Sequence, residues 1–244
     1  VFLFAEFFLW LLSLSSILFV QGFRWPKYLI IKKHLNFGLS AFLSGVLVEL
    51  NTRVDILVLG LFMEDKAVGI YSFGAMIAEG FYSLLVVVRT NLNPIIARYL
   101  AIADYKSLAH LIRKTQMILY PALLIVLVVI VVIFEPMVEI ILRQSDFLQA
   151  ELLLIILLIG IWLACGMLPF EWSLAQGGCP GWQTIFALIV VLSNLSLNFL
   201  LVPTLGMAGA ALGTATSMLI ALFSCSFLTK KILGIDVVFA RYSQ

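Results

Sequence analysis

The stretch LSGVLVELNTRVDILVLGLF, residues 43–62, decides the fold class because it is as long as a bilayer-spanning helix and yet carries ions. A span needs about 20 predominantly apolar residues, and this one contains Glu49, Arg53 and Asp55. Each charged side chain at mid-membrane costs about 2.5 to 3.5 kcal/mol on insertion scales. Such side chains therefore face a bundle interior or a wet cavity, and they indicate a transport path.

The composition places this stretch in an integral membrane protein. Hydrophobic residues make up 63% of the chain and charged residues only 11%, which is more apolar than a soluble globular domain. Alternating β-barrel strands are excluded because the apolar runs are continuous. The expected fold class is an all-α, polytopic membrane helix bundle. We count about seven transmembrane runs, near residues 1–22, 35–62, 68–92, 117–142, 151–175, 183–202 and 208–228.

Cations gather on every second connection between these runs. They occur in RWPKYLIIKKH (24–34, including Arg24 and Lys27), in RYLAIADYKSLAHLIRK (98–114) and after residue 229, whereas the intervening connections hold few. The positive-inside rule then predicts that these connections and the C-terminus are cytoplasmic, which makes this a multi-pass protein of the cell's inner membrane. Residues 94–114 mix apolar and charged side chains, so we expect an interfacial amphipathic helix there.

The sequence offers no sign of catalysis. HExxH, GxSxG and phosphate-binding GxxxxGK[ST] motifs are absent, and no loop is long enough to carry chemistry. The cysteines Cys165, Cys179 and Cys225 lack metal-ligand spacing and suit small buried positions. We therefore expect no enzyme activity, cofactor, metal or nucleic-acid partner. Because the chain begins with Val1 inside an apolar run, we interpret it as a fragment whose N-terminal part is missing.

Polar residues in the second run are spaced to meet on a helix. Glu49 and Arg53 are four positions apart, within pairing reach on one helix face, and Asn51 and Asp55 repeat that spacing on another face. One interpretation is a polar path for a substrate. The other is a neutralised Glu49–Arg53 pair that only locks helix packing.

Further polar positions follow in later runs. Glu79 lies near the centre of the third run and is expected to face a cavity, whereas Arg89 is either an anchor to the headgroups or a substrate contact. Pro169 and Glu171 fall together in the fifth run, where they form either a hinge or gate beside the cavity, or a tolerated kink.

Two motifs in the last runs indicate packing. Asn194 and Asn198 are one helical turn apart and are expected to join helices by hydrogen bonds. Gly209 and Gly213 have GxxxG spacing, which allows close approach of two backbones.

The segments NTRVDILVLG (51–60), VGIYSFGAMIAE (68–79), TNLNPIIARY (90–99) and LNFLLVPTLGMAGAALGTATS (197–217) occur in an order and spacing that resemble a known family. The chain is similar, over about residues 35–230, to the C-terminal half of polysaccharide biosynthesis proteins or O-unit flippases. These belong to the multidrug/oligosaccharidyl-lipid/polysaccharide exporter superfamily. The resemblance implies a transporter of two six-helix lobes. Residues 1–34 would be the last helix of the first lobe plus a basic cytoplasmic linker, 35–230 the second lobe, and 231–244 a cytoplasmic tail.

The resemblance also implies the substrate, an oligosaccharide on an undecaprenyl pyrophosphate carrier, moved across the membrane by alternating access. We expect Arg53 to attract the pyrophosphate or an acidic sugar, and Glu49, Asp55 or Glu79 to set a cation-coupling or charge-balance step. Expected partners are this lipid-linked oligosaccharide and membrane lipids, with the polysaccharide polymerase machinery as a further candidate. Two alternatives stay open: a cation-coupled small-molecule or drug exporter of the same superfamily, and a structural membrane subunit or membrane enzyme.

Overall fold

The computed structural model describes residues 2–21, 28–142 and 144–242, and its contacts divide the chain into two units, Val1–Leu39 and Ser40–Gln244. The first unit holds α1 (Phe2–Gln21) and the beginning of α2 (Tyr28–Asn51). Serine hydroxyls in α1 donate hydrogen bonds to backbone carbonyls one turn earlier, as Ser13 does to Leu9. These bonds satisfy the hydroxyl groups within an apolar helix. The predicted cytoplasmic cations Arg24 and Lys27 lie outside the described residues.

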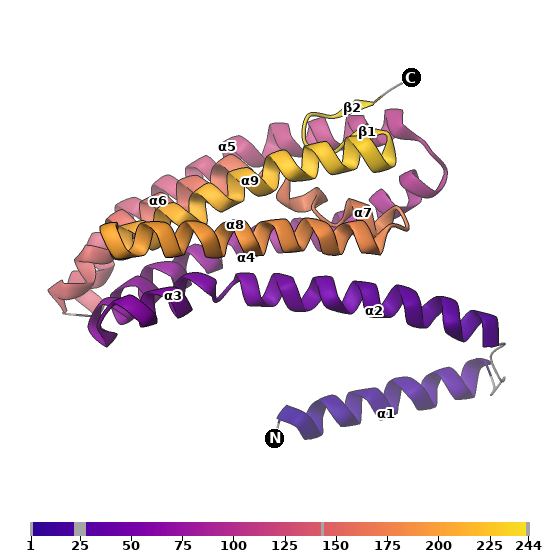
Figure 1. The fold of residues 1–244 in the computed structure, drawn as a ribbon, viewed down its shortest axis with the longest axis horizontal. Helices are drawn as coiled ribbons and strands as arrows, with labels where there is room; N and C mark the ends of the chain where they lie inside the picture. Colours follow the sequence, from indigo (N-terminus) through magenta and orange to yellow (C-terminus); the bar gives the residue numbers. More distant parts are fainter. Residues whose placement is uncertain (1, 22–27, 143, 243–244) are drawn as a thin grey trace. The chain divides into compact units, whose positions relative to one another are not determined.

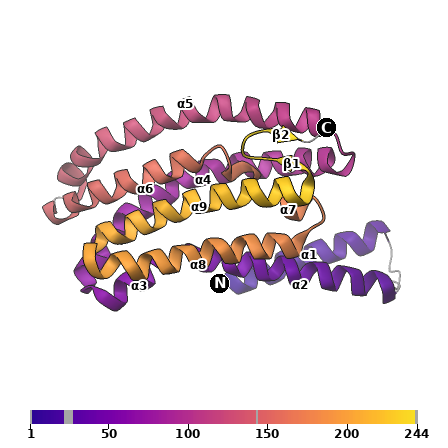
Figure 2. The ribbon, with the colours of Figure 1, turned by 45° about the horizontal axis from the view of Figure 1, so that its top comes forward.

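The second unit is a helix bundle, shown in two views in Figures 1 and 2. Within the described residues, six helices are long and apolar enough to cross a membrane, α1 among them. The expected run 35–62 is instead made by two helices, α2 and α3, joined by a break. The six long apolar helices confirm the predicted all-α polytopic membrane bundle. Its helices after α2 are α3 (Val54–Phe62), α4 (Asp65–Ala101), α5 (Tyr105–Met137), α6 (Ala150–Ala164), α7 (Ser173–Gln176), α8 (Pro180–Leu205) and α9 (Met207–Leu233), with short η turns at Val138–Leu142, Ser145–Gln149 and Leu168–Phe170.

The break between α2 and α3 falls at Thr52 and Arg53. The amides of both residues bond to carbonyls three positions back, on Glu49 and Leu50, so the last turn of α2 tightens instead of continuing. The Thr52 hydroxyl also donates to the Glu49 carbonyl, 2.8 Å away, and competes for the backbone acceptor that a continuing helix would use. The polar residues of the second run therefore lie at the junction of two helices.

Helices α8 and α9 pack most closely, as the small residues predicted. A Cβ on Gly209 would lie 2.3 Å from the Leu201 carbonyl oxygen, and one on Gly213 would lie 3.1 Å from Asn198 Nδ2. Glycine is therefore required at Gly209 for the backbones to come this near.

Two predicted elements are wrong. Residues 94–114 form no interfacial helix, because α4 continues through Pro94 to Ala101 and α5 begins at Tyr105. The apolar side chains Ile96, Leu108 and Ile112 are fully buried, so they lie in the protein core and not at the headgroups. The fifth run is not one kinked helix.

Instead of a kink, the fifth run has a complete interruption. Helix α6 ends at Ala164, and Pro169 lies within the 3-10 turn Leu168–Phe170 before the four-residue α7. Proline lacks an amide hydrogen and disfavours helical geometry in the preceding residue, so the chain does not resume the helix. Glu171 is thereby carried on an irregular segment, residues 165–172.

The chain beyond α9 folds into a small antiparallel hairpin of β1 (Ile235–Asp236) and β2 (Arg241–Tyr242). The Asp236 carboxylate accepts the amides of Val238 and Phe239 at 2.9 and 3.1 Å, which stabilises the turn. Gln116 of α5 donates to the carbonyl of Val238 at 2.7 Å and to that of Gly166 at 3.0 Å. Gln116 thus binds the hairpin to α5 and also binds α5 to the start of segment 165–172.

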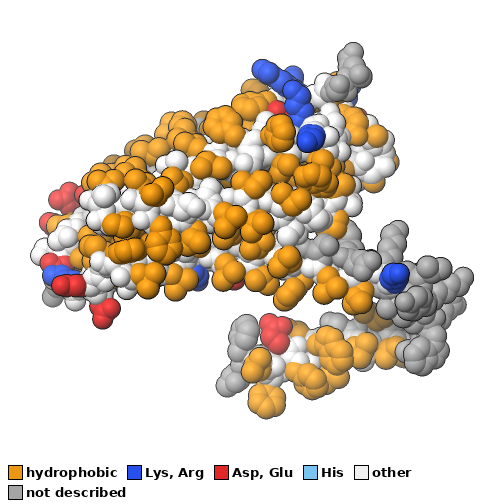
Figure 3. Space-filling view, viewed as in Figure 1, with side chains coloured by type: hydrophobic (Ala, Val, Ile, Leu, Met, Phe, Trp, Pro, Cys, Tyr) orange, Lys and Arg blue, Asp and Glu red, His pale blue; other side chains and the backbone are white. Residues whose placement is uncertain are grey.

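On the face shown in Figure 3, most charged side chains of the second unit lie toward its two ends, while apolar ones cover much of its side. The end with the α3–α4 turn holds Glu64, Asp65 and the ion pair Lys66–Asp146, whereas the opposite end is rich in cations. This matches the alternation seen along the sequence and suits a bundle that crosses a membrane. The cationic end carries Arg98, Lys106, Arg113, Lys114, Lys230, Lys231 and Arg241.

Candidate functional site

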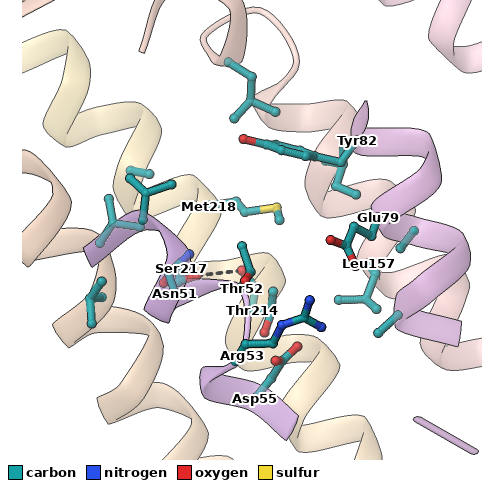
Figure 4. A pocket seen from close by; sticks show the side chains of 18 of the residues that line it. Asn51, Thr52, Arg53, Asp55, Glu79, Tyr82, Leu157, Thr214, Ser217 and Met218 are labelled. Atoms are coloured by element: carbon teal, nitrogen blue, oxygen red, sulfur yellow. Dashed lines mark hydrogen bonds between the residues drawn. The ribbon is translucent and has the colours of Figure 1, made fainter. Parts of the chain in front are cut away.

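A cavity of about 650 Å³ lies within the second unit, among α2, α3, α4, α6, α8, α9 and segment 165–172. Figure 4 shows Arg53, Asp55 and Glu79 converging on it from the α2–α3 junction and from α4. Side chains of both charges line it, four carboxylates and two guanidiniums in all: Glu49, Arg53, Asp55, Glu79, Arg89 and Glu171. The structure therefore brings together all the charged residues singled out in the membrane runs.

Of the two interpretations of the second run, the neutralised Glu49–Arg53 pair is contradicted. Within the described residues the ion pairs are Lys66–Asp146 and Arg89–Glu171. The four-residue spacing places side chains on one face only if the helix is continuous, and α2 stops between them. Glu49, Arg53 and Glu79 are instead exposed to the cavity.

Asp55 is the buried carboxylate of the site, with 7% of the residue exposed. It lies in the first turn of α3, where its Oδ1 accepts the Ile56 amide at 2.9 Å, a position at which a helix terminus favours negative charge. The Tyr71 hydroxyl of α4 donates to its Oδ2 at 2.5 Å. Thr214 of α9 lies beside both Asp55 and Tyr71.

An amide network continues from this carboxylate into α8. Asn194 Nδ2 donates to Asn51 Oδ1 at 3.1 Å, and Asn198 Nδ2 donates to Asn194 Oδ1 at 2.8 Å. Thr214 Oγ1 also donates to Asn194 Oδ1, at 3.4 Å. The bond to Asn51 confirms that Asn194 joins α8 to α2, whereas the bonds donated by Asn198 stay within α8. Within the described residues, the buried Asn198 Oδ1 has no hydrogen-bond partner.

Arg89 and Glu171 meet at another part of the cavity wall. They form an ion pair between α4 and segment 165–172, with 17% and 13% of their side chains exposed. The Arg89 guanidinium lies 5.9 Å from the centre of the Trp172 ring, and Trp172 Nε1 donates to Glu171 Oε1 at 3.2 Å. Arg89 therefore points to a protein partner and does not extend to the headgroups as an anchor would.

The residues missed from the sequence are Tyr71 and Thr214. A tyrosine within an apolar run must find a partner for its hydroxyl when buried, and this was the available signal for Tyr71. Thr214 carries no comparable signal, because a hydroxyl in a helix also bonds to the helix's own backbone.

The fold and site define an integral membrane helix bundle with a charged internal cavity. The family model MatE matches residues 41–200. The chain belongs to the MatE family, whose members are membrane transporters and not enzymes, within the multidrug/oligosaccharidyl-lipid/polysaccharide exporter superfamily. No curated protein and no solved structure matches the chain.

Proposed function

We propose that this chain forms the second lobe of a transporter that moves a lipid-linked oligosaccharide from the cytoplasmic to the outer leaflet. The carrier's pyrophosphate cannot enter about 30 Å of hydrocarbon unshielded. A polar cavity of about 650 Å³ inside a membrane bundle supplies such shielding, while the lipid tail stays in the bilayer. Alternating exposure of that cavity to the two sides would complete the transfer.

The observation that supports this substrate is Arg53. Its guanidinium faces the cavity from the break between α2 and α3 and forms no ion pair within the described residues. A cation kept without a protein partner at membrane depth is suited to an anionic cargo. Asn51 and Glu49, on the same end of α2, would hydrogen-bond to sugar hydroxyls.

Coupling to a cation is assigned in this proposal to Asp55 and its neighbours. One carboxylate with neutral oxygens from Asn194, Asn198 and Thr214 is a donor set of the kind that hard cations prefer, and interrupted helices supply such sites in transporters. Among the residues that the structure describes, Asn198 Oδ1 has no hydrogen-bond partner, which supports the fit. Glu79 would balance charge as the cavity fills.

Cation-coupled export of a small organic solute is the second candidate. It is favoured by the excess of carboxylates over guanidiniums in the cavity lining, because such a wall attracts cations and repels phosphate.

Leaflet assignment in cells separates the two candidates. Cells deleted for the full-length gene are labelled with a membrane-impermeant sugar probe before and after permeabilisation, with rescue by the intact gene, Arg53→Ala or Lys66→Ala. We expect outer-leaflet labelling to fall about tenfold or more with Arg53→Ala, the loss of one charged contact. Lys66→Ala should be neutral, since it removes an exposed cation outside the cavity.

Unchanged labelling with Arg53→Ala at normal protein levels would remove Arg53 from the path. Normal labelling in the deleted cells, together with lost efflux of small organic cations, would favour the second candidate.

A further inference from the structure

The Arg89–Glu171 pair lines the same cavity as Arg53, and Arg89 lies farther along α4 than Glu79 does. Arg89 is ten residues beyond Glu79, or about 15 Å along a helix axis. Both members of the pair line the cavity and keep a fraction of their side chains exposed to it. A ligand in the cavity can therefore reach them.

The ion pair with Glu171 leaves N–H donors of the Arg89 guanidinium available for a ligand. Arginine carries five N–H donors, and the hydrogen bond to Glu171 uses Nη1. The guanidinium also lies over the Trp172 ring, 5.9 Å from its centre, so an aromatic side chain and a carboxylate both help to hold it in place. A planar, oriented guanidinium of this kind is suited to binding phosphate or carboxylate by two parallel hydrogen bonds.

Glu171 has further hydrogen-bond partners that would remain if its ion pair with Arg89 were broken. Its Oε1 also accepts from Trp172 Nε1 at 3.2 Å, and its backbone carbonyl accepts from Gln183 Nε2 at 3.0 Å. The irregular segment that carries it is thus anchored independently of Arg89. A largely buried ion pair is weak support for stability by itself, because desolvation cancels most of its attraction.

We propose that Arg89 is a second anion site of the cavity and that Glu171 occupies it in place of the ligand. The ligand class is an oxyanion group, either the pyrophosphate of the carrier or the carboxylate of an acidic sugar. On binding, a ligand oxygen replaces Glu171 Oε1 at Arg89, while Trp172 keeps its hydrogen bond to the displaced carboxylate. The identity of the carrier rests on the proposed function, but the exchange at Arg89 does not.

This exchange makes a prediction that a purely structural ion pair does not. Removing the charge of Glu171 removes a competitor, so the affinity for an anion should rise. A structural pair would lose stability through either partner and gain no affinity. Glu171→Gln retains the shape of the side chain and an oxygen for Trp172, which makes it the discriminating variant.

The experiment is calorimetric titration of the full-length transporter in lipid nanodiscs with inorganic pyrophosphate, glucuronate or neutral glucose. We expect Glu171→Gln to bind pyrophosphate about 5- to 150-fold more tightly than the wild type, the usual range of coupling between two sites. Arg89→Gln should abolish this binding, and the double variant should behave like Arg89→Gln. Asp146→Asn, which breaks the exposed ion pair with Lys66, is the matched control and should change nothing.

A gain for pyrophosphate alone assigns the site to the carrier's phosphates, and a gain for glucuronate alone assigns it to an acidic sugar. A gain for glucose, an unchanged or lower pyrophosphate affinity in folded Glu171→Gln, or full binding by Arg89→Gln would overturn the proposal. Glu171→Asp, with a shorter carboxylate, should give a smaller gain and serves if Glu171→Gln does not fold. If the intact gene restores outer-leaflet labelling but Glu171→Gln gains no affinity for pyrophosphate or glucuronate, the anion site at Arg89 is refuted and the flippase function is not. If Glu171→Gln gains affinity but the deleted cells show no labelling defect, the flippase function is refuted and the anion site is not.

Discussion

Replacing Tyr71 by phenylalanine should reveal the contribution of the hydrogen bond that holds the buried carboxylate of the site. Tyr71 is fully buried, and its hydroxyl donates to Asp55 Oδ2 at 2.5 Å; a hydrogen bond to a charged acceptor is shorter and stronger than one between neutral groups. Such a bond contributes about 1.5–3 kcal/mol, against about 0.5–1.5 kcal/mol for a neutral pair. Tyr71→Phe should therefore lower the free energy of unfolding by about 1.5–3 kcal/mol.

A double-mutant cycle with Asp55→Asn isolates this contact. In the Asp55→Asn background the same tyrosine substitution should be milder, which gives a coupling energy of about 1–2 kcal/mol. The measurement is unfolding of the full-length protein in mixed micelles, followed by tryptophan fluorescence. Tyr99→Phe, a half-buried tyrosine outside the cavity lining, is the control. If the losses of unfolding free energy in the two single variants add up to that of the double variant within about 0.5 kcal/mol, the two side chains are not coupled and the reasoning is refuted.

Two further predictions concern packing and pH. Gly209→Ala should destabilise the protein by about 1–3 kcal/mol through overpacking of α8 against α9, whereas Gly60→Ala, with open space around its Cβ, should be neutral or stabilising by up to about 1 kcal/mol; equal unfolding curves for both would contradict the close α8–α9 contact. The Ser107 amide, which donates to the Asp104 carboxylate at the start of α5, holds the pKa of Asp104 below its ordinary value of 3.8. Because this pKa is lowered on folding, the cap contributes stability above pH 3.8, and this stability is lost as the pH falls through the folded pKa. Hydrogen exchange of the Ser107 amide, normalised to its intrinsic rate, should therefore accelerate in that pH range in the wild type. It should not accelerate there in Asp104→Asn.

The membrane fold was predictable because a bilayer leaves few options. Long, continuous apolar runs can satisfy their backbone groups in lipid only as helices, so the run lengths alone predict the bundle. The same reasoning places Glu79 at a cavity, since a carboxylate facing lipid is costly. The GxxxG spacing that includes Gly209 and the asparagine Asn194 predict close helix contacts, because small residues let backbones approach and amides hydrogen-bond between helices.

Side-chain partners were less predictable because they come from distant parts of the chain. Glu49 and Arg53 have the spacing of a helical pair, yet the local hydrogen bonds of Thr52 end the helix between them. Asp55 and Arg89 find partners 16 and 82 positions away. Periodicity within a single run carries no information about such contacts, which depend on how the helices pack.

The C-terminal hairpin affects how the orientation of this protein in the membrane can be mapped by reporter fusions. Joining a reporter at Leu233 would remove Ile235 and Val237, which are fully buried, and would leave Gln116 with one of its two carbonyl partners. A junction beyond Arg241 keeps both β-strands and the contacts to α5. The two fusions would therefore report on different molecules: the shorter one keeps the Gln116 bond to Gly166 of segment 165–172 but loses the hairpin and the Gln116 bond to Val238, whereas the longer one keeps both bonds.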